Sequence, residues 1–382
     1  MSLLAIHAAT TEVTAVVVDP RGRIVSTAGH ELVRHAPRPG WVEHAPEDIW
    51  QATLRATREV LASTDATDVT ALGVTNQRGT VVLWDRETLG SPRPAIGSQD
   101  RRTTEIVARM RAEGVQERVA GLRLGPSFAS TLTWLAEHEP HTWALVESGR
   151  YAVGTLDSYL VARMTRGTWH ASDVSNASST GLLDLRTGGW SDELCGVFGV
   201  PRDALPDLVP SWGEVAASEP RVFLGLELPI AGVAGDRSAA LVARGCLEPG
   251  DALCALGPDP SILLSTGPVL EQPVAGLLPT VAWRSPVGEP TYALEGPLGG
   301  RDVLEAVPSV RRLRVDGAGA GDDVACQAMA DRTGLPVERG QAGGTPALGV
   351  ALLAGLGDGV WDSLDGVRDV WALDRRFEPV SG

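Results

Sequence analysis

The chain has 382 residues, of which 43% are hydrophobic and 21% charged, and its formal net charge at pH 7 is −15. This length and composition predict a soluble globular protein with two or three domains rather than a single core. The excess of acidic groups would repel a phosphate backbone, so we expect no nucleic-acid partner.

Several other function classes are disfavoured by what the sequence lacks. No apolar run reaches the roughly 18 residues of a membrane span, and the N-terminus does not have the pattern of a signal peptide, so we expect no membrane partner and a cytoplasmic location. Every cationic side chain is arginine, which excludes a P-loop lysine and Schiff-base chemistry. The cysteines are predicted to be reduced and buried, and the cysteine and histidine spacing predicts no metal site; the cysteines are Cys195, Cys246, Cys254 and Cys326.

In chain order, the hydrophobic pattern predicts alternating strands and helices, which is typical of an α/β protein. The helix after Ala45 has a proline and two acidic residues in its first turn, as helix starts often do. The predicted strands are 3–7, 13–18, 23–27, 71–75, 81–84, 228–233, 252–256, 262–265 and 313–316. The predicted helices are 45–62, 100–113, 154–163, 237–245, 322–332 and 345–354.

A glycine-rich turn follows the predicted strand 313–316 and invites a dinucleotide-binding interpretation. That fingerprint requires a third glycine three places after the second, where this chain has Asp322. No acidic residue lies suitably on a following strand to bind a ribose. We therefore do not assign a dinucleotide site.

An ordered set of longer motifs is more specific. It comprises PRPGWVEHAPEDIW (37–50), GVTNQR (73–78), WDRET (84–88), QDRRT (99–103), SDVSNAS (172–178) and GVAGDRSAAL (232–241). With these motifs the chain resembles the FGGY family of carbohydrate kinases over nearly its full length, most closely its glycerol kinases. The resemblance implies an α/β fold with two actin-like (ribonuclease H-like) domains around a cleft that holds Mg·ATP and a sugar or polyol.

The domains are expected at 1–245, on the substrate side, and 246–382, on the nucleotide side. The second domain is expected to be truncated, because the sequence passes from YALEG (292–296) to RDVLEA (301–306) without a block the size of a small domain. Strands that once packed under this block would expose apolar surface. We therefore expect a homo-oligomer or a protein partner that covers it.

The resemblance assigns the catalytic base to Asp236, at a predicted strand-to-helix turn; a simple helix-capping role is the alternative. The glycerol kinases have glutamine where this chain has Arg237. A guanidinium so close would stabilise the ionised carboxylate and weaken it as a proton acceptor.

The nucleotide side departs further from the family. The motif Asp-Gln-Gly-Thr-Thr is replaced by a segment that starts at His7 and ends at Thr10 and Thr11. Magnesium prefers hard oxygen ligands, so we interpret His7 as the occupant of an abandoned metal site. The other cofactor-side positions implied by the resemblance are Gly257, Asp316, Gly317 and Asp322; prolines after Gly257 remove backbone donors.

The polyol pocket has changed as well. Arg78 is kept, with an ion-pair role as the alternative, but Gly79 replaces a glutamate. Serines replace three aromatic residues, at Ser98, Ser127 and Ser261, so glycerol itself is not expected as the substrate.

Three hypotheses follow. In the first, the fold is kept, phosphoryl transfer is lost or greatly reduced, and the protein acts by binding. In the second, it is an active ATP-dependent kinase for a hydroxyl of another sugar or polyol, with Asp236 as general base. In the third, the cleft performs a different reaction, for which the sequence offers only Asp236 and Arg237.

Overall fold

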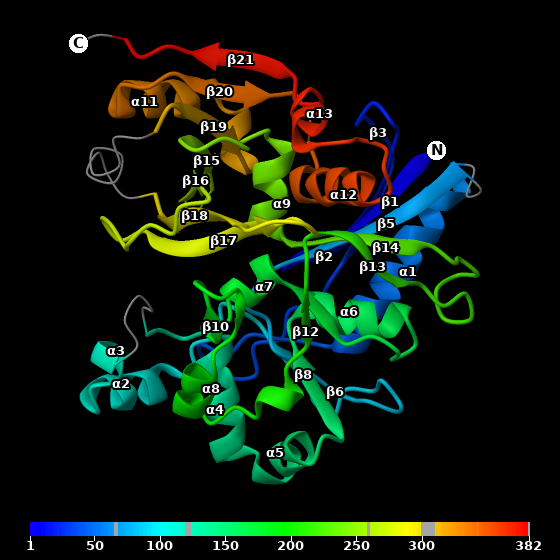
Figure 1. Cartoon of the computed structure of the whole chain (residues 1–382), viewed down its shortest axis with the longest axis vertical. Coiled ribbons are helices and arrows are strands. Elements are labelled where there is room, and N and C mark those ends of the chain that lie inside the picture. Colours follow the sequence, from blue (N-terminus) through cyan, green and yellow to red (C-terminus); the bar gives the residue numbers. More distant parts are fainter. Residues whose placement is uncertain (65–67, 119–123, 258–259, 299–309, 342, 381–382) are drawn as a thin grey trace.

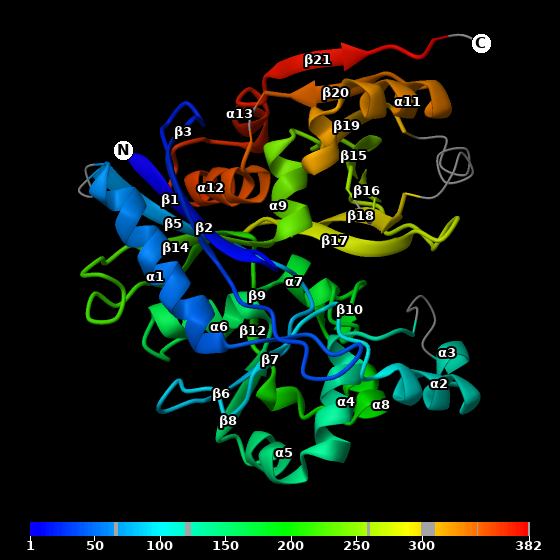
Figure 2. The same ribbon diagram turned by 180° about the vertical axis from the view of Figure 1, so that it is seen from behind.

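The computed structural model describes residues 1–64, 68–118, 124–257, 260–298, 310–341 and 343–380. Two mixed β-sheets form the two halves of the molecule, and helices α9 (Asp236–Ala243) and α12 (Thr345–Gly357) lie between them (Figures 1 and 2). This arrangement is the two-domain actin-like fold that the sequence predicts.

The first sheet contains six strands and is built around β1, which pairs antiparallel with β2 and parallel with β5. Its order is β13 (Trp212–Ala217), β14 (Pro229–Gly235), β5 (Val69–Asn76), β1 (Ser2–Ala8), β2 (Glu12–Val18) and β3 (Ile24–Glu31). Alternation along β1 sends Leu4 and Ile6 into one core and Leu3 and Ala5 into another. Helix α1 (Pro46–Ala62) packs with the first set and α12 with the second, so both faces are covered.

The second sheet contains seven strands in the order β17 (Leu278–Arg284), β18 (Pro290–Pro297), β16 (Ser261–Gly267), β15 (Asp251–Ala255), β19 (Arg312–Asp316), β20 (Val337–Gly340) and β21 (Leu373–Phe377). Helix α11 (Asp323–Thr333) shares a core with β15, β16 and β19. Helix α9 begins directly after β14 and lies against α12 in the core shared by the two sheets. A Cβ on Gly349 of α12 would lie 1.8 Å from the carbonyl oxygen of Ala239, so this close helix contact requires glycine.

A lobe of helices and short strands extends from the first sheet, in the lower half of Figure 1. Its helices are α2 (Thr104–Ala112), α3 (Val115–Arg118), α4 (Phe128–His138), α5 (Pro140–Glu147), α6 (Leu156–Met164), α7 (Val174–Ser178) and α8 (Asp192–Phe198). Its strands are β4 (Glu43–His44), β6 (Val82–Asp85), β7 (Ala95–Ile96), β8 (Tyr151–Gly154), β9 (Ala171–Asp173), β10 (Leu183–Asp184), β11 (Gly189–Trp190) and β12 (Asp207–Val209). Near the end of the chain, α13 (Leu364–Arg368) packs beside α12.

Most predicted elements are present, with two instructive differences. The helix predicted over 100–113 begins at Thr104, because the Asp100 carboxylate accepts hydrogen bonds from the backbone N–H groups of Val42 and Arg102 and holds a loop. Strands β17 and β18 were not predicted, since Pro279 and Pro290 stand at or near their starts and weaken the strand pattern. The described cysteines are free and buried, as predicted.

The apolar surface expected beside the missing block is not found among the described residues. Leu264, Leu277 and Leu294, on or beside the strands that would carry it, are each about 1% exposed. The prediction of an oligomer or partner therefore loses its original reason and stays a prediction. In the described ranges no helix is long and apolar enough to cross a membrane.

The domain boundary at 245/246 stays a prediction too. The chain crosses back after it, because α12 makes its main contacts with α9, β14 and β5 of the first half.

A pair of buried carboxylates lies beneath the first sheet. Asp157, in α6, accepts a hydrogen bond from the hydroxyl of Ser172 at 2.7 Å, while its Oδ1 is buried without a partner. Burial, reinforced by the nearby Asp173 carboxylate, raises the pKa of Asp157 to about 7. Asp157 is therefore largely protonated in the folded protein below neutral pH.

This raised pKa predicts that the free energy of unfolding depends on pH. An unfolded aspartate loses its proton near pH 4, so between about pH 4 and pH 7 the folded state binds more protons and stability falls as the pH rises. Asp157→Asn removes that dependence, so the stability of the variant relative to the native protein should rise by roughly 3–4 kcal/mol between pH 4 and pH 8. Urea unfolding at both pH values measures the difference. Asp362→Asn, at an exposed site, is the control. An equal native-to-variant difference at the two pH values would contradict the assignment.

Candidate functional site

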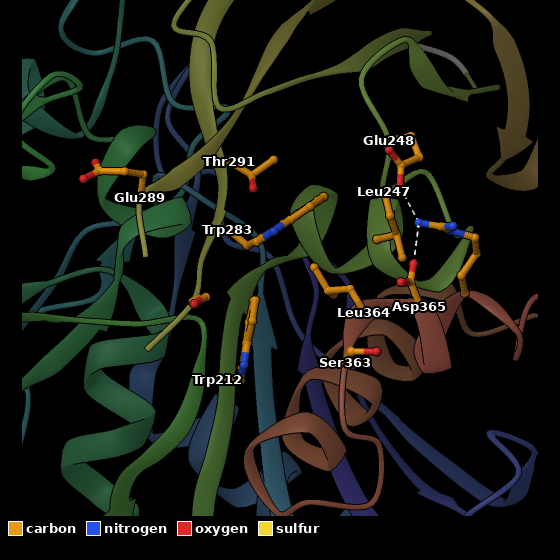
Figure 3. Close-up of a pocket in the computed structure, with 11 residues that line it drawn as sticks. Trp212, Leu247, Glu248, Trp283, Glu289, Thr291, Ser363, Leu364 and Asp365 are labelled. Carbon is orange, nitrogen blue, oxygen red and sulfur yellow. Dashed lines mark hydrogen bonds and ion pairs between the residues drawn. The ribbon is translucent and has the colours of Figure 1, made fainter. Parts of the chain in front are cut away.

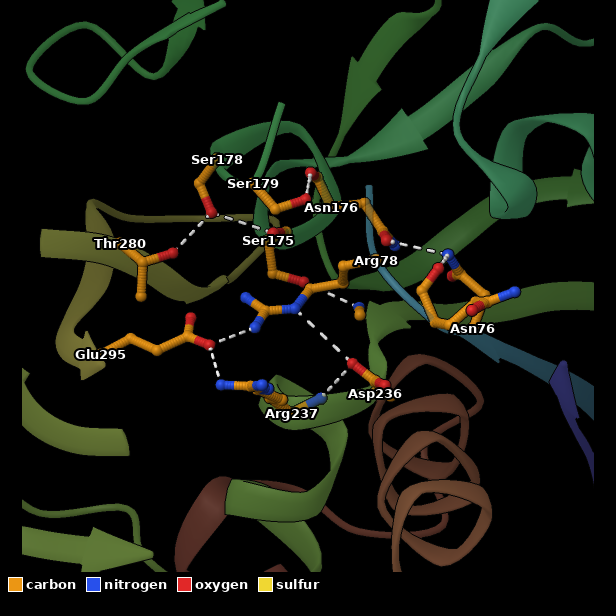
Figure 4. Close-up of polar contacts among 12 residues, drawn as sticks. Asn76, Arg78, Ser175, Asn176, Ser178, Ser179, Asp236, Arg237, Thr280 and Glu295 are labelled. Atoms are coloured by element: carbon orange, nitrogen blue, oxygen red, sulfur yellow. Dashed lines mark hydrogen bonds and ion pairs between the residues drawn. The ribbon is translucent and has the colours of Figure 1, made fainter. Parts of the chain in front are cut away.

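Four charged side chains meet where the two halves of the molecule join, and we call them the interdomain cluster: Arg78, Asp236, Arg237 and Glu295. Arg78 follows β5, Asp236 and Arg237 begin α9, and Glu295 lies on β18 of the second sheet. One oxygen of Glu295, Oε1, accepts hydrogen bonds from Arg78 Nη2 and Arg237 Nη1, both at 2.5 Å (Figure 4). A single carboxylate thus joins the two halves through two guanidinium groups.

The cluster is electrically balanced and mostly shielded from water. The exposed fractions of the side chains are 10% for Arg78 and 17% for Glu295. Burial alone would raise the pKa of Glu295, but the guanidiniums of Arg78 and Arg237 outweigh it and lower the pKa to about 2. Burial opposes the charge on Arg78 as well, yet Glu295 and then Asp236 raise its pKa. Glu295 and Arg78 therefore both carry their charges at neutral pH.

Asp236 stands at the first position of α9 with 30% of its side chain exposed. Its Oδ1 accepts the backbone N–H of Arg237 at 2.8 Å and lies 3.5 Å from Arg78 Nε. Its Oδ2 has no hydrogen-bond partner in the part of the chain that the structure describes. The expected pairing of the Arg237 guanidinium with Asp236 is not observed, because that guanidinium binds Glu295 instead.

The backbone at Gly235 determines how closely the Arg78 side chain can lie to α9. A Cβ on Gly235 would lie 2.4 Å from Arg78 Cδ, so only glycine admits the arginine beside α9. The N–H of Gly235 donates to Ser175 Oγ at 2.9 Å, and Asn76 donates to the Asn176 side chain at 3.1 Å (Figure 4). Sequence reasoning missed Glu295 and these polar supports, although the motifs YALEG and SDVSNAS contain most of them.

The other predicted substrate-side residues have varied surroundings. Gly79 has a φ of 75°, and a Cβ there would lie 3.5 Å from Ser98 Cβ, so these two positions are neighbours. Ser127 caps helix α4 in a reciprocal arrangement with Ser130. Ser261 starts β16 and is buried. Their part in binding a substrate stays a prediction.

A cavity of about 720 Å³ includes Arg244, the residue after α9, in its wall, and it brings together three of the predicted cofactor-side residues. His7, Asp316 and Gly317 line it, with Glu12 and Arg244 also in its wall. Arg244 is held in place, since it donates to Asp316 at 2.8 Å and to the Thr345 hydroxyl at 2.9 Å. Such a volume is within the range of small-molecule sites.

The remaining predicted cofactor-side residues do not line this cavity. The Thr10 hydroxyl donates to Gln77 at 2.9 Å, and the Thr11 carbonyl accepts the N–H of Leu32. Asp322 caps helix α11 through the N–H of Val324, which gives it a structural role. Gly257 stands in a loop whose next two residues, 258 and 259, lie outside the described residues.

Comparison with known proteins decides the family. Residues 2–243 match the N-terminal domain, and residues 299–357 the C-terminal domain, of the FGGY family of carbohydrate kinases. The chain belongs to the FGGY family.

Its relatives within the family include glycerol kinases. The chain is 35% identical to the glycerol kinase of Methylobacterium nodulans and 34% identical to that of Symbiobacterium thermophilum, in each case over 99% of this chain and 94% of the relative. The first alignment spans 476 positions, 94 more than the 382 residues of this chain, so the relative has at least that many positions without a counterpart here. This agrees with the expected missing block.

Solved structures confirm the FGGY fold. Glycerol kinase of Plasmodium falciparum, solved with ADP, has a TM-score of 0.93 at 22% identity, covering 99% of this chain and 94% of that one. Xylulose kinase of Rhodospirillum rubrum has a TM-score of 0.88 at 20% identity, covering 100% and 94%.

The residues of this FGGY protein do not fit the magnesium that the family resemblance implies. His7 Nε2 is buried without a hydrogen-bond partner, and burial lowers the pKa of His7 against the opposing effect of Asp236 and Glu12, so the imidazole is neutral. A neutral imidazole is a poor ligand for magnesium. Within the described ranges, no three His, Cys, Asp or Glu side chains are grouped so that they could hold a metal ion.

The turn between β1 and β2 fits a bound phosphate no better. The N–H of Ala9 donates to the carbonyl of Glu12 at 2.9 Å, so it is not free to bind a phosphate oxygen. The Glu12 side chain lines the same cavity and adds a negative charge. Both features oppose a bound triphosphate.

The interdomain cluster predicts unequal effects of two substitutions. Glu295→Gln leaves the shielded Arg78 without its charged partner and should lower the free energy of unfolding by about 2–4 kcal/mol. Arg237→Gln, at a side chain that is 44% exposed, should lower it by about 1 kcal/mol or less. Urea unfolding at pH 7 measures both. Equal losses would show that the pair with Arg78 does not hold the halves together.

The interpretation of position 7 as an abandoned metal site predicts a gain of function. His7→Asp supplies a hard oxygen ligand beside the cavity and should make the melting temperature rise with ATP only when magnesium is present. Thermal unfolding with ATP, with and without magnesium, measures it, and His7→Asn is the uncharged control. The same response in the Asp and Asn variants would contradict the role given to position 7.

Proposed function

We propose that this FGGY protein has lost, or retains only in greatly reduced form, ATP-dependent phosphoryl transfer and acts by binding a small molecule or a protein partner. The observation that carries the proposal is His7: a neutral imidazole, whose Nε2 is buried without a hydrogen-bond partner, stands where the family motif has an aspartate. Phosphoryl transfer depends on a metal ion and on donors that neutralise the triphosphate. Both requirements are unmet at the positions that would supply them.

The interdomain cluster supports the proposal from the substrate side. Arg78 is the arginine kept from the family motif. Its guanidinium forms an ion pair with Glu295 and lies near Asp236. A polyol hydroxyl that sought Arg78 would compete with a shielded, charge-assisted ion pair. Serines stand at positions 98, 127 and 261 in place of aromatic residues. The apolar contacts that could offset the cost of breaking this ion pair are therefore missing.

One observation favours the second hypothesis, an active kinase for a sugar or polyol other than glycerol. Asp236 is partly exposed, and its Oδ2 is left without a hydrogen-bond partner in the described residues, as a general base requires. In that case Mg·ATP is the phosphoryl donor and Asp236 accepts the proton of the attacking hydroxyl. For the third hypothesis, a different reaction in this cleft, we find no further reacting group.

ADP release separates these proposals. The native protein is assayed with Mg·ATP and a panel of sugars and polyols, beside Asp236→Asn. We expect no ADP above the no-enzyme background from either protein. Turnover by the native protein that disappears in Asp236→Asn would establish the second hypothesis instead, because loss of a general base typically costs about 100-fold or more.

The cytoplasmic location and the oligomer or partner remain proposals of the same kind. A homo-oligomer would give a multiple of the 40.1 kDa chain mass in light scattering. A monomeric mass at micromolar concentration would leave only the heterologous partner.

A further inference from the structure

A second cavity lies at the outer edges of the two sheets, and we call it the edge pocket. Trp212 begins β13, an edge strand of the first sheet, and Trp283 lies on β17, an edge strand of the second. Leu247, after α9, and the segment Ser363–Arg368 complete its wall (Figure 3). It shares no lining residue with the interdomain cluster or with the cavity beside His7. The pocket is therefore a separate site that contacts both halves of the molecule.

Its walls combine aromatic surface with an unused donor. The rings of Trp212 and Trp283 and the side chain of Leu364 project into the same space (Figure 3). Trp283 is only 2% exposed as a whole residue, and its indole N–H donates no hydrogen bond within the described residues. Its Nε1 is not one of the fully buried polar atoms, so the N–H can be reached from the pocket and has no acceptor among the described residues. A ligand oxygen in the pocket would supply one.

Charge limits what that ligand can be. The guanidinium of Arg368 is paired with the carboxylates of Glu248 and Asp365 (Figure 3). Glu289, also in the wall, has no ion-pair partner among the described residues. The wall of the pocket thus carries three carboxylates and one arginine, and this excess of negative charge disfavours a phosphorylated or otherwise anionic ligand.

We propose that the edge pocket binds a neutral, unphosphorylated polyhydroxylated molecule, a monosaccharide or a polyol. Its volume, about 390 Å³, suits a small ligand. The C–H face of such a molecule packs on the indole rings, one hydroxyl accepts from the Trp283 N–H, and another donates to Glu289. A purely cationic ligand would fit the charge, but it would leave the indole donor unpaired. The inference is independent of phosphoryl transfer, because it uses none of the residues proposed for it.

Calorimetric titration of the full chain tests the proposal, with D-glucose, D-xylose, xylitol and glycerol as probes and glucose 6-phosphate and methylammonium as contrasts. We expect saturable binding of at least one neutral probe. Glu289→Gln, at an exposed side chain, and Trp283→Phe, which keeps an aromatic ring but removes the donor, should each weaken it about tenfold or more.

Two control variants locate the bound probe. Trp169→Phe changes an exposed tryptophan outside the pocket, and Asp236→Asn changes the interdomain cluster; neither should alter the affinity. The proposal is overturned if no neutral probe binds at high millimolar concentration, or if glucose 6-phosphate or methylammonium binds more tightly. It is equally overturned if Asp236→Asn abolishes binding while Glu289→Gln leaves it unchanged, since the probe would then occupy the cleft. Unchanged affinity in Glu289→Gln also overturns the proposal, and this result can be obtained even if Trp283→Phe does not fold.

Discussion

The Glu295 carboxylate is the contact on which the centre of this molecule depends. One of its oxygens accepts hydrogen bonds from two arginines that belong to the other half of the structure, each at 2.5 Å. Because Arg78 is only 10% exposed, its charge would be costly without a partner. Strand β5 leads to Arg78, α9 carries Arg237, Gly235 leaves room for the Arg78 side chain, and β18 carries the glutamate. The ion pairs thus join the halves and occupy the guanidiniums of Arg78 and Arg237.

On the nucleotide side, too, an arginine is held by other residues of the same chain. Arg244 is fixed by Asp316 and Thr345, so the larger cavity has a defined wall. Its other side carries His7 and Glu12 in place of metal-binding and phosphate-binding groups. The fold is that of the FGGY kinases, while the guanidiniums of Arg78 and Arg244 are paired with carboxylates of the same chain. These pairings support the proposal that the protein acts by binding, because phosphoryl transfer requires groups that are free to stabilise the charge that develops during the reaction.

Much of this could be predicted from the sequence because the motifs are local. GVAGDRSAAL predicted a strand, a tight turn and a helix, and β14 and α9 have that form. His7 could be interpreted from a short motif in one strand. Glu295 could not, since its partners are 217 and 58 residues away and only the folded chain shows them. The expectation that the Arg237 guanidinium lies beside Asp236 was wrong for the same reason. The two residues are neighbours in the sequence, but in the folded chain the guanidinium pairs with Glu295 of the second sheet.

Calorimetric titration of the native protein with ATP, in the presence and absence of magnesium, tests the central claim most directly. If the metal position has been abandoned, ATP shows no magnesium-dependent binding at millimolar concentration. Saturable binding that requires magnesium would contradict the account, because it would mean that the residues around His7 still hold a metal-bound triphosphate.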